Sequence, residues 1–329
     1  MNSRSHFQPL GVLALWLVLC TATARADGPA PRTTLIVVEG AAGEPEFAPE
    51  FRQQTEAWQR AGATGGAEVV TIGVAPASAA GDREDLRQAI VRHAAGETEL
   101  WLVLIGHGTF DGREAKFNLR GPDVSEAELA EWLRPVTRPL ALINTSSASA
   151  PFLAKLAGRN RVVVTSTRSG NEQNYARFGR FLAAAITDAA ADLDRDGQVS
   201  LLEAYLAASQ RTAEFYAGAM RLATEHALLD DNGDGLGTPA DWFKGVRATR
   251  QAKEGAAVDG PRAHQFHLIR SAGEQRLDPE VRRRRDALEL NLAQLRESKR
   301  ALSAEEYQEK LRRLLLELAA VYVEPVPAR

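Results

Sequence analysis

The ten residues ELWLVLIGHG, Glu99–Gly108, hold the most hydrophobic run of the chain after its N-terminal segment. Six consecutive apolar residues are expected of a strand buried on both faces of a sheet. This run ends at His107, which stands between two glycines. A second run, LALINTSSAS at residues 140–149, also passes from apolar residues into small polar side chains. The two runs predict strands that end in polar turns.

Segments of strand and helix character alternate on both sides of these runs. Further strands are predicted at residues 33–40, 67–74 and 159–170, and helices at 45–62, 81–96, 123–136, 150–158 and 174–190. The apolar spacing changes from continuous runs to a helical period each time. This alternation indicates an α/β domain over residues 33–190 with a doubly wound, mostly parallel sheet.

The rest of the chain divides into two further parts. Residues 191–270 hold two acidic loops on either side of a long helical stretch, Leu201–His226. Residues 275–329 are charged, with leucines at helical spacing and a capping box at Ser303–Glu306. These patterns predict a calcium-loop region with EF-hand-type loops, followed by a C-terminal helical hairpin.

The amino-acid composition does not indicate a strongly charged binding partner. The chain has 329 residues, is 44% apolar and 25% charged, and carries a formal charge of −3. That balance is ordinary for a globular protein. It gives no reason to expect nucleic acid or an anionic membrane as a partner.

The N-terminal segment is typical of a secretory signal peptide. Arg4 precedes the apolar run Leu10–Leu19, which is too short to span a bilayer, and Ala24–Ala26 fits a cleavage signal. The alternative is an N-terminal membrane anchor. We expect residues 1–26 to be removed on export to the periplasm or the exterior, leaving no stable membrane span. The only cysteine, Cys20, would leave with them, so the mature chain would have neither a disulfide nor a catalytic thiol.

The first acidic loop, DLDRDGQVSLLE at Asp192–Glu203, matches the EF-hand calcium loop at each diagnostic position. Gly197 allows the sharp turn at the sixth position. An acidic surface turn would rarely place all of these residue types in register. The expected Ca²⁺ ligands are the side chains of Asp192, Asp194, Asp196 and Glu203, the carbonyl of Gln198, and Ser200, often through water.

The second acidic loop, DDNGDGLGTPAD at Asp230–Asp241, matches less well. Its last residue is one methylene shorter than the usual glutamate, and Gly237 replaces an apolar residue. A glycine-rich turn without an ion is the alternative. The expected Ca²⁺ ligands here are Asp230, Asn232, Asp234, the carbonyl of Leu236, and Asp241.

The order of motifs resembles the caspase-like clan of cysteine peptidases, and most closely its legumain branch. The resemblance covers roughly residues 33–190 and rests on the strand that ends in His107-Gly108 and the strand that leads into Asn144–Ser149. It implies a caspase-like fold, with His107 as the catalytic histidine and Gly108 as an oxyanion donor. It also implies that Thr145 stands where the family has its cysteine.

The replacement of that cysteine bears on activity. A threonine hydroxyl is far less acidic than a thiol, and threonine nucleophiles rely on their own N-terminal amine, which Thr145 lacks. Three alternatives follow: a peptidase-like site that does not hydrolyse, a hydrolase that uses Thr145, Ser146 or Ser147 with His107, or a purely structural turn. In a hydrolase, Asp111 or Asp123 would be candidates to orient His107.

The remaining histidines after the N-terminal segment show no metal-ligand spacing. They are His93, His226, His264 and His267, and we expect ordinary surface histidines. The sequence as a whole predicts an exported calcium-binding protein with a caspase-like domain that does not hydrolyse peptides. It would bind calcium and a peptide or protein partner. A Ser/Thr hydrolase and a structural calcium scaffold of an envelope complex are the alternatives.

Overall fold

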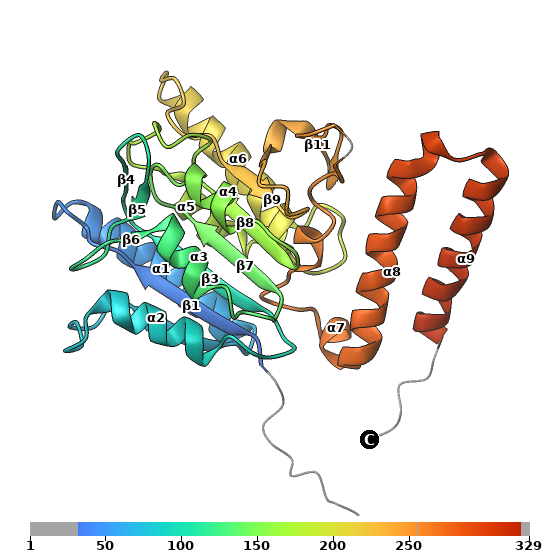
Figure 1. Ribbon diagram of the computed structural model, residues 1–329, viewed down its shortest axis with the longest axis horizontal. Coiled ribbons are helices and arrows are strands. Elements are labelled where there is room, and N and C mark those ends of the chain that lie inside the picture. Colours follow the sequence, from blue (N-terminus) through green and yellow to red (C-terminus); the bar gives the residue numbers. More distant parts are fainter. Residues whose placement is uncertain (1–31, 255, 324–329) are drawn as a thin grey trace, which may run out of the picture. The chain divides into compact units, whose positions relative to one another are not determined.

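The structure, a computed structural model, describes residues 32–254 and 256–323. The predicted signal peptide, residues 1–26, lies outside these residues. The described part forms one compact unit with a seven-stranded sheet at its centre. Figure 1 shows the sheet with helices packed on it and the C-terminal hairpin following in sequence.

Five parallel strands make up most of the sheet, and all five were predicted. The spatial order is β10-β9-β8-β7-β3-β1-β2. The parallel strands are β1 (Thr34–Glu39), β2 (Glu68–Ile72), β3 (Leu100–Ile105), β7 (Leu140–Asn144) and β8 (Arg161–Thr165). The strands β1, β3 and β7 are buried along their whole length. This explains why they read as continuous apolar runs.

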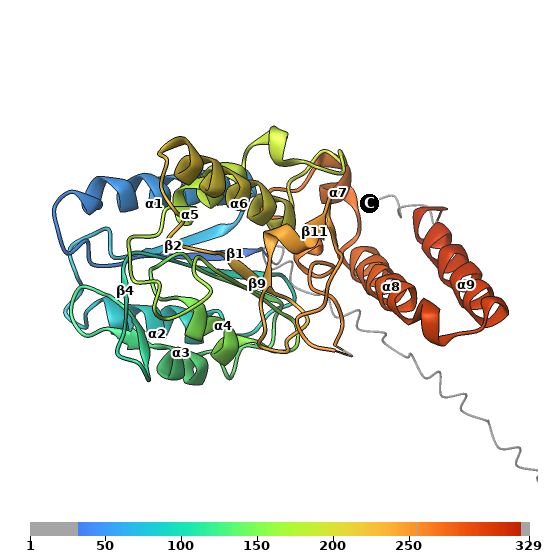
Figure 2. The same cartoon turned by 90° about the horizontal axis from the view of Figure 1, so that it is seen from above.

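Helices cover both faces of the sheet, as Figure 2 shows from above. One face packs on α1 (Phe47–Thr64), α5 (Phe178–Ala185) and α6 (Leu201–Gly218). The other packs on α2 (Asp82–Arg92), α3 (Glu126–Trp132) and α4 (Ala150–Leu156). Successive residues of a strand point to opposite faces of the sheet and so pack in two separate hydrophobic cores. Val103 lies in the core beneath α1, α5 and α6, and Leu104 lies in the core beneath α2, α3 and α4. The predicted α/β class with a mostly parallel sheet is confirmed.

The acidic-loop region contributes to this sheet, which was not predicted. Two short strands, β9 (Leu228–Asp230) and β10 (Thr238–Pro239), extend it beyond β8 in antiparallel pairing. The helix predicted to run to His226 ends at Gly218, and Met220 has a positive φ of 52°. The chain turns there so that the residues around Leu229 can reach β8. Residues 191–270 are therefore part of the α/β unit.

Smaller elements complete the described chain. A three-stranded sheet of β4 (Gly108–Phe110), β5 (Ala115–Phe117) and β6 (Val124–Ser125) leads from β3 to α3. The hairpin β11 (Phe243–Lys244) and β12 (Arg247–Ala248) follows β10. The short helical turns are η1 (Ala189–Ala191), η2 (Ala240–Trp242), η3 (Ala263–Gln265), η4 (Ser298–Ala301) and α7 (Ala272–Arg276).

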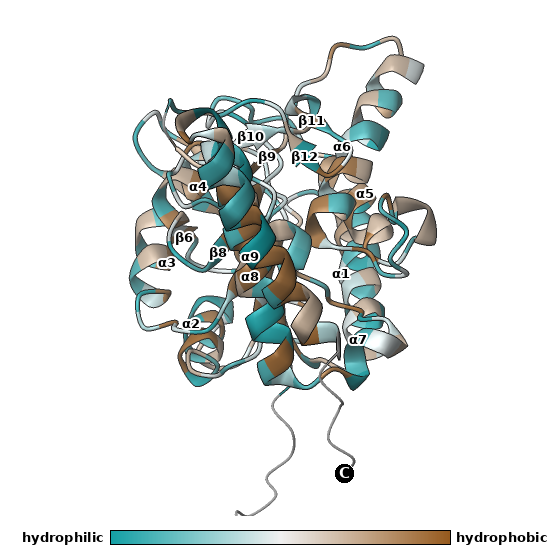
Figure 3. Cartoon of the chain, turned by 90° about the vertical axis from the view of Figure 1, so that its right-hand side faces the viewer, coloured by the Kyte–Doolittle hydropathy of each residue, from teal (hydrophilic) through white to brown (hydrophobic). Residues whose placement is uncertain are grey.

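The C-terminal helices pair as expected. They are α8 (Pro279–Glu297), which begins after the N-cap Asp278, and α9 (Ala304–Val323). Leu288, Leu292 and Leu295 of α8 are buried, as are Tyr307 and Val321 of α9. Figure 3 looks onto this hairpin, whose helices carry hydrophilic and hydrophobic residues side by side. None of the described helices is long and apolar enough to cross a membrane.

Candidate functional site

His107 lies at the end of β3, within a group of aromatic rings. Its ring makes edge contacts with Phe47, at a centroid distance of 4.6 Å, and with Phe51 and Tyr175, at 5.1 and 6.0 Å. Its Nε2 lies 3.2 Å from the carbonyl oxygen of Ala42. A carbonyl only accepts, so Nε2 carries the proton of the neutral ring and Nδ1 keeps a lone pair. Burial lowers the pKa of His107, which favours this neutral form.

The carboxylates considered as partners of His107 have other roles. Asp111 Oδ1 accepts hydrogen bonds from the N–H groups of Arg113 and Glu114, inside the β4–β5 turn. Asp123 accepts from the Asn118 side chain and the Leu119 N–H. Neither carboxylate bonds to His107, so neither of these two candidates orients the histidine in this structure. The orienting group is the backbone carbonyl of Ala42.

Thr145 follows β7, the strand next to β3, as the resemblance requires. Its Oγ1 donates to the Leu104 carbonyl at 2.9 Å, and the residue is only 4% exposed. Gly179 of α5 covers it: a Cβ added at Gly179 would come within 2.7 Å of the Thr145 Cβ and 2.8 Å of Oγ1. The Thr145 hydroxyl is therefore already bonded and lies beneath a helix.

The two serines after Thr145 are also buried. Ser146 Oγ donates to Asn144 Oδ1 at 2.7 Å, while Ser147 Oγ is enclosed without a hydrogen-bond partner. Gly108 packs directly against this turn, because a Cβ on it would lie 2.2 Å from the Ser147 carbonyl oxygen. In the β4–β5 ladder Gly108 lies opposite Phe117, and the Asn118 N–H donates to the His107 carbonyl. This pattern makes Gly108 and Phe117 a non-hydrogen-bonded pair. The N–H of Gly108 therefore points away from β5.

A segment after β8 closes over the turn. Ala148 adopts a positive φ of 52°, and its N–H donates to the Glu172 carbonyl at 2.8 Å. The Glu172 carboxylate is in turn 2.6 Å from His226 Nδ1. Ser149 is fully buried against Ser166 and Thr167. Every hydroxyl of the turn is thus enclosed.

His107 and the hydroxyl turn therefore share one edge of the sheet without forming a catalytic pair. No hydrogen bond within the described residues joins His107 to Thr145, Ser146 or Ser147. A nucleophile has to meet its substrate, and Thr145 is 4% exposed, Ser146 0% and Ser147 2%. In this state the turn can support the sheet edge but cannot present a hydroxyl to a peptide.

The first acidic loop brings its carboxylates together. Oxygens of Asp192, Asp194 and Asp196 all lie within 4.8 Å of one another. Gly197 has φ +87°, the left-handed conformation that the sixth position of such a loop needs, and its N–H donates to Asp192 Oδ2 at 3.0 Å. Burial, followed by the charges of Asp196 and Glu203, raises the pKa of Asp194.

Glu203 closes this loop from the first turn of α6. Its Oε1 accepts from the Leu193 N–H at 2.8 Å, and its Oε2 accepts from the Ser200 N–H and hydroxyl. Ser200 is also the N-cap of α6, so the pair forms a capping box. The Gln198 side chain bonds to Asp196 Oδ2 and accepts from the Ser271 N–H. Glu203 thus ties both ends of the loop together, at 1% exposure.

The second acidic loop closes differently from the expectation. Asp230 accepts from the N–H groups of Gly233 and Gly235, Asn232 Oδ1 accepts from Asp234, and Asp234 Oδ1 accepts from Leu236. Asp234 Oδ2 is buried without a hydrogen-bond partner. The residue expected at the twelfth position, Asp241, lies exposed in η2.

Asp259 is the carboxylate that packs on this loop. It is 1% exposed, its Oδ1 accepts from the N–H groups of Asp231 and Asn232, and its Oδ2 accepts from the Thr238 hydroxyl. Burial and the nearby Asp259 charge raise the pKa of Asp230 to about 7. The loop therefore encloses carboxylates that form no ion pair with a basic side chain among the described residues. Buried carboxylates without such a partner favour the binding of a cation.

The histidines set aside at the sequence level are not ordinary surface residues. His93 and His267 are buried, at 9% and 8% exposure, and His226 pairs with Glu172. His264 lies beside the first acidic loop, with Nε2 3.2 Å from Asp194 Oδ2. Sequence spacing could not reveal His264 or Asp259, because each comes from a segment remote from the loop it joins.

Comparisons with known proteins add the following. No family model matches the chain, and no curated protein does. The solved structures that are similar to the chain include three at 11–12% identity. A protein of Geobacter sulfurreducens aligns with 61% of this chain and 93% of its own, with a TM-score of 0.41. Caspase-1 from Spodoptera frugiperda aligns with 61% of this chain and 86% of its own, with a TM-score of 0.40. The Drosophila initiator caspase Dronc aligns with 63% of this chain and 81% of its own, with a TM-score of 0.42.

Proposed function

We propose that this protein is an exported calcium-binding protein whose caspase-like domain does not hydrolyse peptides. The observation that carries the calcium proposal is the convergence of Asp192, Asp194 and Asp196 within 4.8 Å, with Glu203 buried behind them. Hard carboxylate oxygens in this number are the ligands that calcium prefers. The bound ion would brace the start of α6 and the segments that pack on it.

The second loop supports a further calcium ion with a changed ligand set. In this proposed set Asp230, Asp234 and Asp259 would supply carboxylates, and the buried, unpartnered Oδ2 of Asp234 is an oxygen that a cation would satisfy. Asp241, which lies exposed in η2, is not part of this proposed set. Leu236 and Asn232 keep their proposed positions on the loop.

The absence of hydrolysis is proposed from the burial of the turn. Thr145, Ser146 and Ser147 are enclosed, and His107 faces aromatic rings and a carbonyl. Purified protein is expected to leave Asn- and Asp-containing peptides intact. Peptide cleavage that His107→Ala abolishes would instead establish the alternative, a Ser/Thr hydrolase. The proposed partner of such a domain is a peptide or protein held without cleavage.

Calcium binding is tested by thermal unfolding with and without calcium, in Glu203→Gln and in a matched control. At about 10 mM calcium and a dissociation constant of about 10⁻⁴–10⁻³ M, typical of extracellular modules, one ion stabilises the fold by about 1.4–2.7 kcal/mol. Glu203→Gln should lose most of this gain, because an amide cannot clamp the ion with two anionic oxygens.

The control is Glu128→Gln. Ser125 and Glu128 form the same capping box at the start of α3, with no acidic loop before it. Both substitutions weaken a cap, but only Glu203→Gln should reduce the calcium response. Unchanged melting of the wild type with calcium and with chelator would remove the basis of the proposal.

A further inference from the structure

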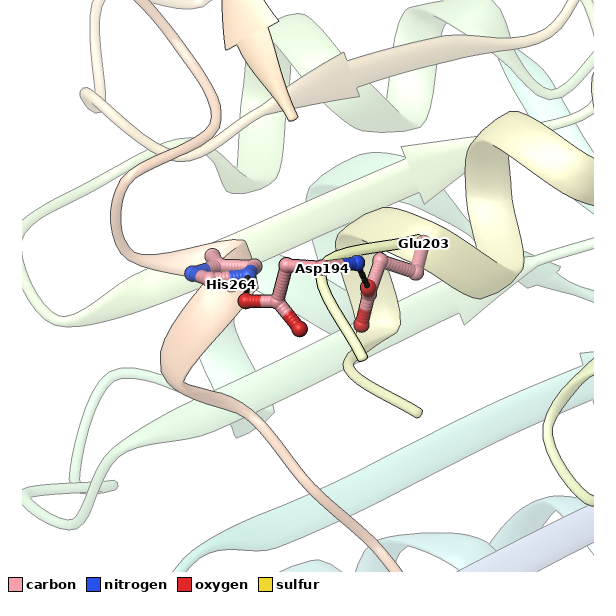
Figure 4. Close-up of side chains that lie close together, drawn as sticks. All are labelled: Asp194, Glu203 and His264. Carbon is pink, nitrogen blue, oxygen red and sulfur yellow. Dashed lines mark hydrogen bonds and ion pairs between the residues drawn. The ribbon is translucent and has the colours of Figure 1, made fainter. Parts of the chain in front are cut away.

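His264 stands where a ligand from outside the first acidic loop would stand. A nitrogen of its ring and oxygens of Asp194 and Glu203 all lie within 4.8 Å of one another. Figure 4 shows the three side chains together, with the imidazole and the Glu203 carboxylate on opposite sides of Asp194. Glu203 is buried and His264 is about one-third exposed at its side chain. The three residues therefore form a mixed set of one imidazole and two carboxylates.

The backbone that carries His264 is fixed from two directions. The N–H groups of Gly260 and Ala263 donate to the two oxygens of the buried Asp231, at 2.9 and 2.7 Å. On the other side, the Leu201 N–H donates to the Phe266 carbonyl at 2.8 Å. The turn η3 is thus anchored to the second loop and to the first residue of α6. His264 is held at the first loop by structure that does not depend on its own side chain.

His267 gives an independent indication of a ligand. It is only 8% exposed, and it lines a cavity of about 520 Å³ together with Asp194, Asp196 and His264. Its Nδ1 lies 3.3 Å from the Gln265 carbonyl, so Nδ1 donates the proton of the neutral ring and Nε2 keeps a lone pair. That Nε2 forms no hydrogen bond with the described residues. An imidazole nitrogen that keeps a free lone pair on the wall of this cavity is a group that can bind a metal ion.

The chemistry of this set differs from that of a pure calcium loop. Calcium takes hard oxygen ligands and gains little from imidazole, whereas zinc and related transition metals bind imidazole and carboxylate together. We propose that a transition-metal ion of the zinc type binds at Asp194, Glu203 and His264, with His267 beside it. The proposal rests on the proposed cation-binding function of the first loop. Because Asp194 and Glu203 are shared, this ion and calcium compete.

The test measures binding of Zn²⁺ and of Ca²⁺, each added alone to the full chain, by titration calorimetry. In His264→Ala we expect Zn²⁺ affinity to fall by about tenfold or more, the range found when groups that support a metal site are removed. Calcium affinity should stay within about twofold, because the oxygen ligands remain. In the wild type, saturating calcium should weaken the apparent Zn²⁺ affinity. The variant His264→Asn repeats the test if the alanine variant fails to fold.

The control is His226→Ala, which removes the histidine of the His226–Glu172 pair away from the loop. This variant should bind both ions as the wild type does. Zinc binding that is unchanged in His264→Ala, or that falls equally in His226→Ala, overturns the inference and leaves the calcium proposal standing. If neither ion binds the wild type, the proposed function fails together with it.

Discussion

The substitution Gly179→Ala tests whether α5 truly covers Thr145. The added Cβ would lie 2.6 Å from Gln54 Oε1, 2.7 Å from the Thr145 Cβ and 2.8 Å from the Thr145 Oγ1. Gln54 can move the end of its side chain, but Thr145 cannot easily move. It is β-branched, its hydroxyl is bonded to the Leu104 carbonyl, and its backbone continues β7.

The expected cost follows from two opposed effects. Overpacking a well-filled interior costs about 1–3 kcal/mol, while replacing glycine by alanine inside a helix gains about 0.5–1 kcal/mol. The net effect should be a loss of up to about 2.5 kcal/mol in the free energy of unfolding. Gly218→Ala in α6 is the matched control, because a Cβ there meets nothing within 4 Å. It should be neutral or stabilising.

Urea unfolding of both variants, followed by far-ultraviolet circular dichroism, measures this difference. A lower midpoint with an unchanged m-value is the expected result for Gly179→Ala. If Gly179→Ala is as stable as Gly218→Ala, Thr145 does not lie beneath α5. The case against an accessible hydroxyl nucleophile would then be lost.

Three further predictions concern the candidate sites. In a Cys20→Ser background, the thiol of Thr145→Cys should react with Ellman's reagent on the order of 100-fold more slowly than the exposed thiol of Thr187→Cys. The reason is that only local opening of the fold exposes a side chain at position 145. Equal rates for the two thiols would contradict the burial of Thr145. His107 has a pKa lowered by burial, so the stability due to its neutral form is present above about pH 6.5 and is lost as pH falls through the lowered pKa. His107→Gln should flatten the fall in urea midpoint between pH 7.5 and 5.5, and parallel pH profiles would refute this. Asp259→Ala should reduce the number of calcium ions bound by one and Asp241→Ala should not; the reverse would restore Asp241 as the ligand.

Local sequence patterns were sufficient for most of the fold. The strands β1, β3 and β7 are buried on both faces, so apolar residues dominate them, and the polar residues of β1 and β7 stand only at strand ends. Glycine, proline and capping residues marked the helix ends well, as at Ser125 for α3 and Asp278 for α8. The order of the elements then indicated a mostly parallel sheet, because alternating strands and helices pack in few ways.

The sequence was less informative where distant segments meet. The strand β9 has three residues, too few for a periodic signal, and pairs with β8 only after α6 turns back. Asp259 and His264 join the acidic loops through the fold of the segment after β12. The burial of the hydroxyl turn depends on Gly179 and on Glu172, which are remote from Thr145 in sequence. The motif at residues 144–149 shows which hydroxyl groups the turn contains, but it does not show which other segments bury them.

The pairing of β9 with β8 has a consequence for how this chain can be divided. Without residues 228–239, β8 would become an edge strand, and its sequence RVVVT would offer unpaired N–H and C=O groups beside three valines. Such an edge recruits strands from other molecules. In the intact chain the outermost strand at this edge, β10, has two residues and ends in Pro239, which cannot donate to a further strand. A fragment that stops at residue 190 should therefore aggregate, although it contains every predicted strand of the sheet. By covering β8, the acidic region would keep the preceding domain from associating through this edge.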